Sequence, residues 1–452
     1  MKPRPSSLPG LSVRSLMRSA GRALRPRSDA IAFRALPPDA ASYQRLADHL
    51  EGYLRDDFLT CWYPRAVDTE RGGFHQDFAE DWSPRPPSDR MIVAQARHTW
   101  VCARAAELMP ELAPHALGGL EYLAGPMWDQ EHAGPYFFVG LDGRADTERG
   151  GEKHTCGVVF SIFAAVAVFE ATHDPRALDL ARRAFEWLDR VAHDGNNGGY
   201  FEALARDGSP LHEAPQAGWH DEIGTPYGFK SLNTHIHVLE ALAALHRVDP
   251  GPLVRARLEE LLTLIRDRLI VEPGALNFYF THDWRALPMH NSFGHDVEAA
   301  YLLIDACDTL GRGDDPETQR AARAVVDHAL DWGWDRKNGG LWYAGQALGP
   351  PLDRSKSWWV QAEGLNALLH MHELHGHESD RYWAAVLAQL DFIFAHQIDA
   401  RHGGWFARVS EDGREVLFGR EKATAWKTPY HDGRALMNAV AIFRRLSGSP
   451  KR

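Results

Sequence analysis

Asp194-Gly195-Asn196-Asn197-Gly198-Gly199-Tyr200 is one copy of a phrase that the chain repeats: an aspartate, three residues, two glycines, and an aromatic or large apolar residue. The interval from Asp194 to the next clear copy, at Asp335, is about two units long, and a degenerate copy lies inside it, around residues 271–278. The chain then divides into six units of about 65 residues, and such self-similarity indicates a fold built by repetition. The remaining copies begin at Asp68, Asp129 (a degenerate one), Asp335 and Asp399.

Each unit contains two helical patterns, of which one is amphipathic. In the stretch 174–191, Asp174 is a typical N-cap and Pro175 is typical of the first helical position. Apolar residues follow at helical spacing, with charged residues between them, which predicts a helix with one solvent-exposed face. Asp249-Pro250 and Asp315-Pro316 are expected to open equivalent helices.

The other pattern of each unit is apolar on nearly every side, as in 158–169. A helix of this kind is buried on most sides, and this stretch is too short to span a bilayer. Similar stretches are 93–107, 232–247, 293–310, 358–372 and 429–446.

Six buried helices that alternate with six amphipathic ones predict an all-α fold, an (α/α)6 barrel of two concentric rings. The double-glycine turns would join an outer helix to the next inner one, through short strands such as 404–409. An open superhelix of helical hairpins is the alternative, but it needs polar capping repeats at its ends. The first and last apolar stretches are no more polar than the middle ones, which favours a closed ring.

Composition limits the class of protein. The chain has 452 residues and a net charge of −11, without a basic patch in the repeats, so we expect neither a nucleic-acid nor a membrane partner. Its four cysteines lack metal-ligand spacing, and a chain of this length needs no disulfides, which favours a reducing, cytoplasmic compartment. We expect a monomer or a homodimer.

The repeats occupy residues 41–450 as one catalytic domain, and residues 1–40 precede them as a basic tail. Residues 1–28 hold seven basic residues and no acidic one, and they lack the apolar core of a secretory signal. We expect this tail to be disordered and solvated. An organelle transit peptide is the alternative reading of such an Arg- and Ser-rich start.

If the ring closes, the first turns of the inner helices meet at one end of the barrel, where their polar residues would form one pocket for a small polar ligand. Each of these residues taken alone is more often structural, but their equivalent positions in several repeats favour function. They are Arg97, Trp100, Lys153, His154, Asn233, His235, His237, His295, Asp296, Glu298, Trp358, Gln361, Glu363, Tyr430, His431 and Arg434.

Helical spacing sorts these residues further. Asn233 and His237 share a face, whereas His235 points elsewhere. His295 can touch Glu298, and His431 can touch Arg434. A glutamate would raise the basicity of its histidine and an arginine would lower it, which would give the paired base and acid that proton-transfer chemistry requires.

Other kinds of site are less well supported. His235 and His237 with Glu298 suggest a metal, but residues two apart on a helix diverge and no His-Glu-x-x-His motif is present. We therefore expect no metal and no cofactor. A nucleophile elbow and a phosphate-binding loop are also missing from the sequence. The double-glycine phrase itself is best explained as a turn, since glycine permits positive φ.

Four phrases of the sequence, 231–237, 292–298, 358–363 and 426–434, stand out together with Arg97. They resemble the N-acylglucosamine 2-epimerase superfamily, and within it most the cellobiose 2-epimerases. The similarity covers nearly all of residues 41–450, with the motifs in order. Three positions depart from the family's usual residues and leave substrate choice open: Cys156 and Phe293 stand in place of tyrosine, and Asp432 in place of asparagine.

The resemblance implies an (α/α)6 barrel and metal-free epimerisation or isomerisation at carbon 2 of a reducing sugar. His295 and His431 would be its acid–base pair, and His237 would assist ring opening or hold the substrate. Trp358 and Trp426 would shape the sugar subsites. The remaining substrate contacts would be Arg97, Asn233, Glu298, Glu363 and Arg434.

Three further functions remain open at this point. An aldose–ketose isomerase differs from an epimerase only in the carbon that receives the last proton. A glycoside hydrolase on the same barrel needs two carboxylates beside a glycosidic bond, for which Glu298 and Glu363 are the candidates. A carbohydrate-binding protein without catalysis would use the same pocket.

Overall fold

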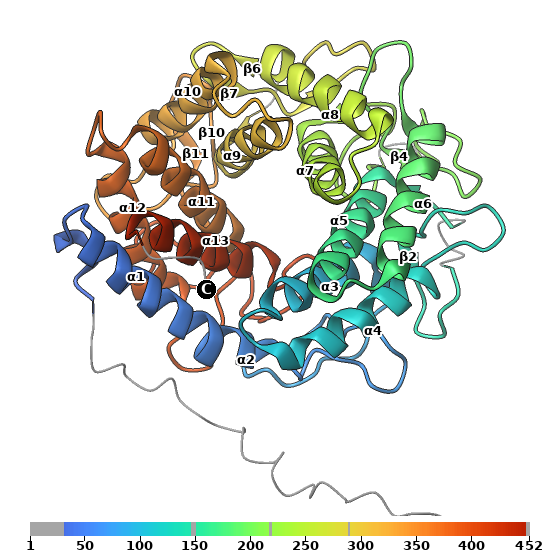
Figure 1. The fold of residues 1–452 in the computed structure, drawn as a ribbon, viewed down its shortest axis with the longest axis horizontal. Coiled ribbons are helices and arrows are strands. Elements are labelled where there is room, and N and C mark those ends of the chain that lie inside the picture. The colour runs from blue at the N-terminus through green and yellow to red at the C-terminus, as the bar shows by residue number, and fades with distance from the viewer. Residues whose placement is uncertain (1–30, 146–150, 217–218, 288–289, 449–452) are drawn as a thin grey trace, which may run out of the picture.

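The apolar stretches form a ring of inner helices that surrounds the barrel axis (Figure 1). The computed structural model describes residues 31–145, 151–216, 219–287 and 290–448. The predicted inner helices are confirmed in all six units. They are α3 (Ile92–Ala105), α5 (Thr155–Thr172), α7 (Leu232–Val248), α9 (Phe293–Thr309), α11 (Trp358–His375) and α13 (Tyr430–Leu446).

A second ring of helices covers the first. Each outer helix packs on one inner helix: α4 on α3, α6 on α5, α8 on α7, α10 on α9, α12 on α11 and α1 on α13. The inner ring closes because α13 contacts α3 as well as α11, which confirms the (α/α)6 barrel over the open superhelix. The outer helices are α1 (Ala40–Tyr53), α4 (Ala113–Ala124), α6 (Pro175–Ala192), α8 (Pro252–Leu264), α10 (Pro316–Trp332) and α12 (Arg381–Phe392), and the short α2 (Leu59–Trp62) follows α1.

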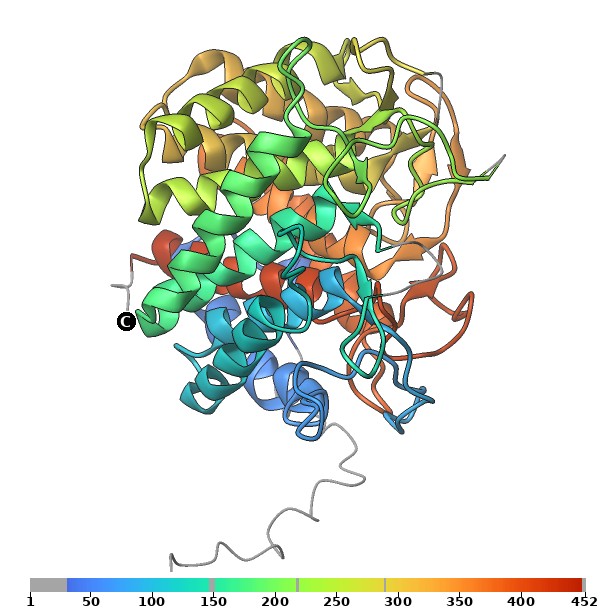
Figure 2. The same ribbon diagram turned by 90° about the vertical axis from the view of Figure 1, so that its right-hand side faces the viewer.

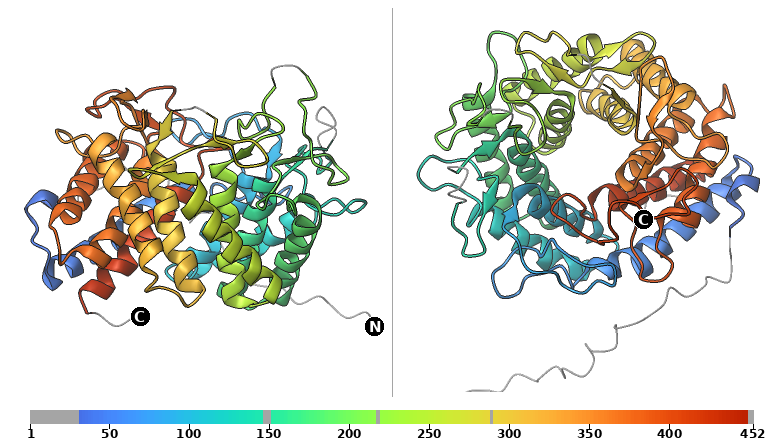
Figure 3. Two further views of the ribbon diagram at one scale, coloured as in Figure 1. Left: turned by 90° about the horizontal axis from the view of Figure 1, so that it is seen from above. Right: turned by 180° about the vertical axis from the view of Figure 1, so that it is seen from behind.

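Short strands and long loops gather at one end of the barrel, which is the upper end in the left view of Figure 3 and the right side of Figure 2. A two-residue strand directly precedes five of the inner helices, and it pairs with a strand from a following turn. All these pairs are antiparallel, so the N-termini of the inner helices are held at this end. The pairs are β1 (Arg90–Met91) with β2 (Phe138–Val139), β3 (Lys153–His154) with β4 (Ala203–Leu204), β5 (Lys230–Ser231) with β8 (Tyr279–Phe280), β9 (Asn291–Ser292) with β10 (Ala344–Gly345), β10 with β11 (Pro351–Asp353), β12 (Lys356–Ser357) with β13 (Arg408–Val409), and, in the worn copy, β6 (Ile270–Val271) with β7 (Ala275–Leu276).

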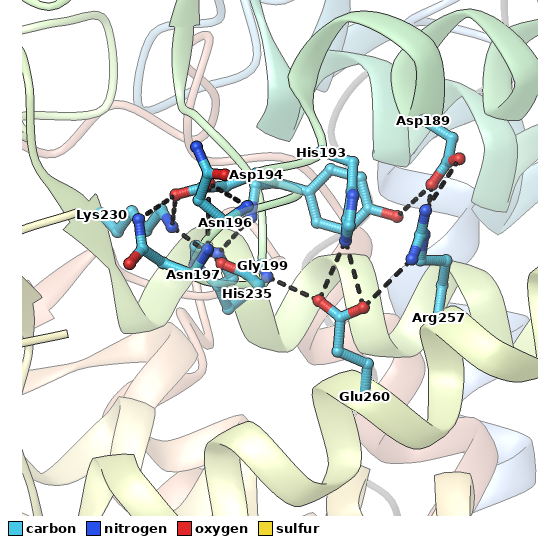
Figure 4. A network of polar contacts seen from close by, with 12 residues as sticks. Asp189, His193, Asp194, Asn196, Asn197, Gly199, Lys230, His235, Arg257 and Glu260 are labelled. Atoms are coloured by element: carbon cyan, nitrogen blue, oxygen red, sulfur yellow. Dashed lines mark hydrogen bonds and ion pairs between the residues drawn. The ribbon is translucent and has the colours of Figure 1, made fainter. Parts of the chain in front are cut away.

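The repeated phrase is a turn with a buried ion pair at its centre (Figure 4). Oδ1 of Asp194 accepts the backbone N–H groups of Asn196 and Asn197 at 3.0 and 3.1 Å. Lys230, at the start of the next inner helix, donates to Oδ2 of Asp194 and to the carbonyl of Gly198, both at 2.8 Å. Gly198 itself has φ +76°, where L side chains are strained.

This ion pair recurs in four other units, always between buried side chains. In each case a cation from the segment before an inner helix reaches back to the aspartate of the preceding turn, so the aspartate ties two successive elements together. The turn could be predicted from the sequence, but the basic residue that pairs with its aspartate could not. The pairs are Asp68–Arg90 at 2.5 Å, Asp129–Lys153 at 3.1 Å, Asp335–Lys356 at 2.8 Å and Asp399–Lys422 at 2.5 Å.

Two of the three predicted helix starts are confirmed. Asp174 and Asp315 are N-caps whose side chains accept backbone N–H groups of α6 and α10. The predicted start at Asp249-Pro250 is wrong, because α8 begins at Pro252 with Gly251 as its N-cap. The carboxylate of Asp249 is engaged elsewhere, in an ion pair with Arg182 of α6 at 2.7 Å.

The predicted tail lies outside the described residues up to position 30. The described remainder packs on α12: Phe33 is buried, Arg34 pairs with Asp391 at 2.7 Å, and Trp383 donates to the carbonyl of Leu36 at 2.9 Å.

One helix, α5, is long and apolar enough to cross a membrane by composition alone. Its residues are mostly buried inside the barrel, where it packs on α3, α6 and α7. Its composition is therefore that of a core helix. The four cysteines are unpaired.

Candidate active site

A cavity of about 240 Å³ lies at the N-terminal ends of the inner helices. The closed ring brings eight of the ten predicted site residues to its wall, from five inner helices and the segment before α13. These eight are Arg97, Asn233, His237, His295, Glu298, Trp358, Trp426 and His431, and the other lining residues are Cys156, Ile223, Thr225, Phe278 and Trp359.

His431 is held by a carboxylate behind it. Its Nδ1 lies 2.5 Å from Oε1 of Glu363. Burial opposes ionisation of Glu363, but the charge of Arg434 and the contact with His431 outweigh it and lower the pKa of Glu363. An ionised carboxylate only accepts, so Nδ1 carries the proton. Nε2 has no partner among the described residues, and burial lowers the pKa of His431 to about 3, which leaves a free lone pair on the cavity side.

His295 has the opposite tautomer. Its Nε2 lies 3.2 Å from the amide oxygen of Asn233, and its Nδ1 lies 2.7 Å from Oγ of Ser292. Because an amide oxygen only accepts, Nε2 carries the proton and Nδ1 accepts from the serine hydroxyl. Burial also lowers the pKa of His295 to about 3. The two imidazoles therefore carry their protons on different nitrogens: His431 on Nδ1, with a free lone pair on Nε2, and His295 on Nε2, which donates to Asn233.

The indole of Trp359 connects the two rings. Its centroid lies 4.7 Å from that of His295 and 5.9 Å from that of His431. Trp359 belongs to one of the phrases singled out in the sequence, but no role was assigned to it.

The predicted contacts of the two histidines are wrong, although, in addition to burial, the charge of Arg434 does contribute to the lowered pKa of His431, as predicted. His295 was paired with Glu298 and His431 with Arg434, on the basis of spacing along one helix. In the structure the carboxylate partner belongs to His431 and comes from the neighbouring helix α11, while Glu298 accepts from Arg434 at 2.6 Å. The pKa of His295 is accordingly lowered, and the expected rise in its basicity does not occur.

Arg97 reaches the cavity without a counterion. It is 5% exposed, and its guanidinium makes no hydrogen bond or ion pair with a described residue. Among the described residues, the guanidinium lies over the ring faces of Phe160, at 4.5 Å, and Tyr430, at 5.0 Å. A buried positive charge without a partner is costly unless a ligand supplies the negative charge. Arg97 is therefore placed to bind an anion or a developing oxyanion.

Arg434 and Glu363 do not line the cavity; they form the layer beneath it. Arg434 donates to Glu298 at 2.6 Å and to Glu363 at 2.8 Å, and it also contacts Glu240. Burial and the nearby charge of Glu363 raise the pKa of Glu298 to about 8. Glu298 thus keeps its proton to a higher pH than an ordinary carboxyl group.

Several residues that were expected at the pocket lie elsewhere. Trp100 lines a second hollow of about 770 Å³ at the opposite end of the barrel. Lys153 belongs to a turn ion pair. His235 points away from the cavity, as its spacing from Asn233 and His237 predicts, and accepts from the backbone N–H of Tyr200 at 2.9 Å (Figure 4). Gln361 accepts from the backbone of Leu341, and Asp296 accepts from Asn291 at 2.5 Å.

His154 takes part in a buried network that anchors one wall of the cavity. It lies 2.9 Å from Asp221, which accepts the backbone N–H of Thr225 at 2.7 Å, and Thr225 also donates to Glu202 at 3.1 Å. Burial opposes protonation of His154, but Asp221 outweighs it and raises its pKa. This network fixes the segment that places Ile223 and Thr225 at the cavity. The segment with Ile223 and Thr225 could not be predicted as part of the site, because it lies outside the repeated phrase.

The three departures from the family pattern have different positions. Cys156 lines the cavity, whereas Phe293 is fully buried and does not line it. Asp432 is buried beside Lys427 and also lies outside the cavity wall. Only Cys156 is therefore placed to touch a ligand.

Two buried clusters among the described residues have the composition of a metal site, namely His154 with Glu202 and Asp221, and Glu298 with Glu363 and His431. In the first, Glu202 and Asp221 accept from hydroxyl and backbone groups. In the second, Arg434 supplies the positive charge. Both clusters are explained by protein donors.

Comparison with known proteins places these residues in a family. A family model described as N-acylglucosamine 2-epimerase (GlcNAc 2-epimerase) matches residues 72–435. The chain is 29% identical over 401 residues to a cellobiose 2-epimerase of Bacteroides fragilis, covering 86% of this chain and 97% of that protein. It is 25% identical over 402 residues to a D-mannose isomerase of Marinomonas mediterranea, covering 84% and 94%. The solved structure of a cellobiose 2-epimerase from Spirochaeta thermophila matches with a TM-score of 0.80 at 30% identity, covering 90% and 98%.

Proposed function

The chain belongs to the N-acylglucosamine 2-epimerase family and is an enzyme of the epimerase and isomerase type, and we propose that it inverts carbon 2 of a free reducing sugar. One observation carries this proposal: two neutral imidazoles of opposite tautomer, His431 and His295, share a small cavity with the unpaired guanidinium of Arg97.

Deprotonation of carbon 2 is assigned to His431. In the open-chain sugar the aldehyde acidifies the hydrogen on carbon 2, and Nε2 of His431 accepts it. The imidazolium that forms is stabilised by the ionised carboxylate of Glu363 on its other nitrogen. The product of this step is an enediolate.

Arg97 and Glu298 stabilise that enediolate. Arg97 brings a positive charge that none of the described residues neutralises by direct contact, and Glu298 brings the proton of a carboxyl group whose pKa is raised. Both act in a site that is largely enclosed, where electrostatic interactions are stronger than in water. The mechanism therefore obtains its electrophilic groups from the chain itself.

Return of a proton to carbon 2 is assigned to His295. The negative charge of the enediolate favours the protonated form of this imidazole, and the imidazolium then delivers a solvent-derived proton to the opposite face of carbon 2. Delivery to carbon 1 instead would give a ketose. An aldose–ketose isomerase is thus the second candidate, and the similarity to D-mannose isomerases favours it as the alternative.

A disaccharide such as cellobiose is the first substrate to test, because relatives that match along most of the chain are named cellobiose 2-epimerases. Trp426 is 39% exposed and Trp358 is half-buried, so two indoles of the cavity wall are available to stack on a sugar ring. A glycoside hydrolase is less well supported, since Glu363 does not line the cavity and is already bonded to His431, Tyr301 and Asn366.

The experiment is to incubate cellobiose, lactose, mannose, glucose and N-acetylglucosamine with the enzyme in heavy water and to follow carbon 2 by NMR. Deuterium at carbon 2 with inverted configuration is the expected result for at least one sugar. A ketose product would identify the isomerase, and release of a monosaccharide from a disaccharide would identify the hydrolase. No isotope uptake from any of the five sugars would contradict the proposal.

A further inference from the structure

A second histidine of the cavity has its own carboxylate, which the chemistry at carbon 2 does not use. Nδ1 of His237 lies 3.1 Å from Oε2 of Glu240, one turn further along α7. Nε2 of His237 makes no hydrogen bond to any described residue, and the side chain lines the cavity. The contact has the same form as that of His431, whose Nδ1 is bonded to a carboxylate oxygen of Glu363.

Glu240 is held in its ionised form. Tyr430 donates to its two oxygens at 3.0 and 3.1 Å, and Arg434 makes an ion pair with it. Burial opposes ionisation of Glu240, but the charge of Arg434 and the contact with His237 outweigh it and lower the pKa of the carboxyl group. Since an ionised carboxylate only accepts, the proton of a neutral His237 must sit on Nδ1.

Neutrality of His237 follows from its surroundings. Burial lowers its pKa, and the positive charges of Arg97 and Arg434 act in the same direction, while Glu240 opposes them. The imidazole packs against the ring of Phe160, with centroids 4.7 Å apart, which limits its rotation.

We propose that Glu240 is the positioning residue of His237: it fixes the Nδ1–H tautomer and thereby directs the lone pair of Nε2 at the bound sugar. The inference rests on the proposed function and on the ring-opening role that the family resemblance implies for His237; what it adds is Glu240, as the group that sets the tautomer of that base. Glu240 itself keeps its charge throughout, because Arg434 and Tyr430 make it a poor proton acceptor.

Arg434 links this pair to the other one. Its two terminal nitrogens contact Glu240 on one side and Glu363 on the other. One buried guanidinium therefore holds the carboxylates of both histidines from a position below the cavity wall.

The first test does not depend on turnover. Nitrogen-15 NMR of the histidine side chains at neutral pH, assigned with the H237N variant, is expected to show Nδ1 of His237 protonated and Nε2 unprotonated. The opposite tautomer, or an equal mixture of the two, would overturn the proposal even if the enzyme epimerises a sugar.

The second test isolates ring opening. In the H295A background carbon 2 chemistry is blocked, and interconversion of the α and β anomers of cellobiose still reports ring opening. Adding E240Q is expected to reduce the rate constant of this interconversion by roughly 10- to 100-fold with little change in KM, because loss of a supporting carboxylate commonly has effects of this size. Adding E240A should reduce it further, since the glutamine oxygen still accepts from Nδ1.

E107Q is the control, because Glu107 and Glu240 both line the second hollow but the carboxylate bonded to His237 is that of Glu240. Anomer interconversion that is unchanged by E240Q, or equally reduced by E107Q, would contradict the proposal. If the wild-type enzyme shows no exchange at carbon 2, but ring opening and the tautomer of His237 are as expected, the proposed epimerase activity fails and the role of Glu240 stands.

Discussion

His431 and Glu363 are 68 residues apart in the chain and share a hydrogen bond of 2.5 Å. The two residues belong to neighbouring inner helices, α13 and α11, which the ring holds side by side. The carboxylate is fully buried and also accepts from Tyr301 and Asn366, so it cannot turn away from the imidazole. The orientation of the proposed base is therefore a property of the ring.

Replacing Glu363 by glutamine is expected to lower kcat for epimerisation roughly 10- to 100-fold with little effect on KM. The amide can still accept from Nδ1 of His431, but it has no charge to stabilise the imidazolium. Steady-state kinetics with the best sugar of the heavy-water panel measures this. E373Q is the control on the same helix, because Glu373 makes a surface ion pair with Arg445. Equal kinetics in the two variants would exclude a role for Glu363.

Replacing Arg97 by methionine is expected to lower kcat by roughly 10²–10³-fold, the usual cost of removing one oxyanion donor. Thermal stability should stay the same or rise, because the variant removes a buried charge without a partner. Activity and thermal unfolding are measured on the same preparation. A marked loss of stability would mean that Arg97 has a structural role.

Activity should fall on the alkaline side of about pH 8, where Glu298 loses its proton. The folded-state pKa lies above the ordinary 4.5, so the proton is present below about 8 and lost above it. The free energy of unfolding should also fall as pH rises from about 4.5 to 8, since only the unfolded chain releases this proton in that range. The E298Q variant should show neither the loss of activity at alkaline pH nor the fall in the free energy of unfolding. If its activity falls at alkaline pH as in the wild type, another group causes that loss.

Replacing Lys230 by methionine is expected to cost about 3–5 kcal/mol of stability, because it leaves Asp194 buried without its cation. Urea unfolding followed by fluorescence gives the free energy. R182A is the control: Arg182 makes an exposed pair with Asp249, and such pairs contribute about 0–1 kcal/mol. Similar losses in the two variants would show that the turn does not depend on its buried ion pair.

The repeat and its closure could be predicted from the sequence because both depend on local patterns. Glycine at a positive φ, as at Gly198, and apolar residues at helical spacing, as in α5, leave a signal within each unit. Six units, each with one buried and one amphipathic helix, then predict the two concentric rings of the barrel. Eight of the ten candidate site residues reached the cavity because equivalent positions of the inner helices converge.

The partners of the site residues could not be predicted in this way. Spacing along one helix suggested His295 with Glu298, but neighbouring inner helices offer closer groups, and the choice depends on how each helix is rotated about its axis. Arg434 and Glu240 are 194 residues apart and still in contact. The sequence contains no local signal for such a pair, and the same holds for Asp129 with Lys153 across a turn.

The inner helices are synthesised in chain order, so the ring can close only after its last helix has been made. The helix that bears His431 is the last of the inner ring and packs on α1, the first helix of the barrel, as well as on α3 and α11. On the proposed mechanism, the cavity lacks its base until α13 has emerged from the ribosome. Partly made chains should therefore be inactive, and a premature stop before codon 431 should yield an inactive product.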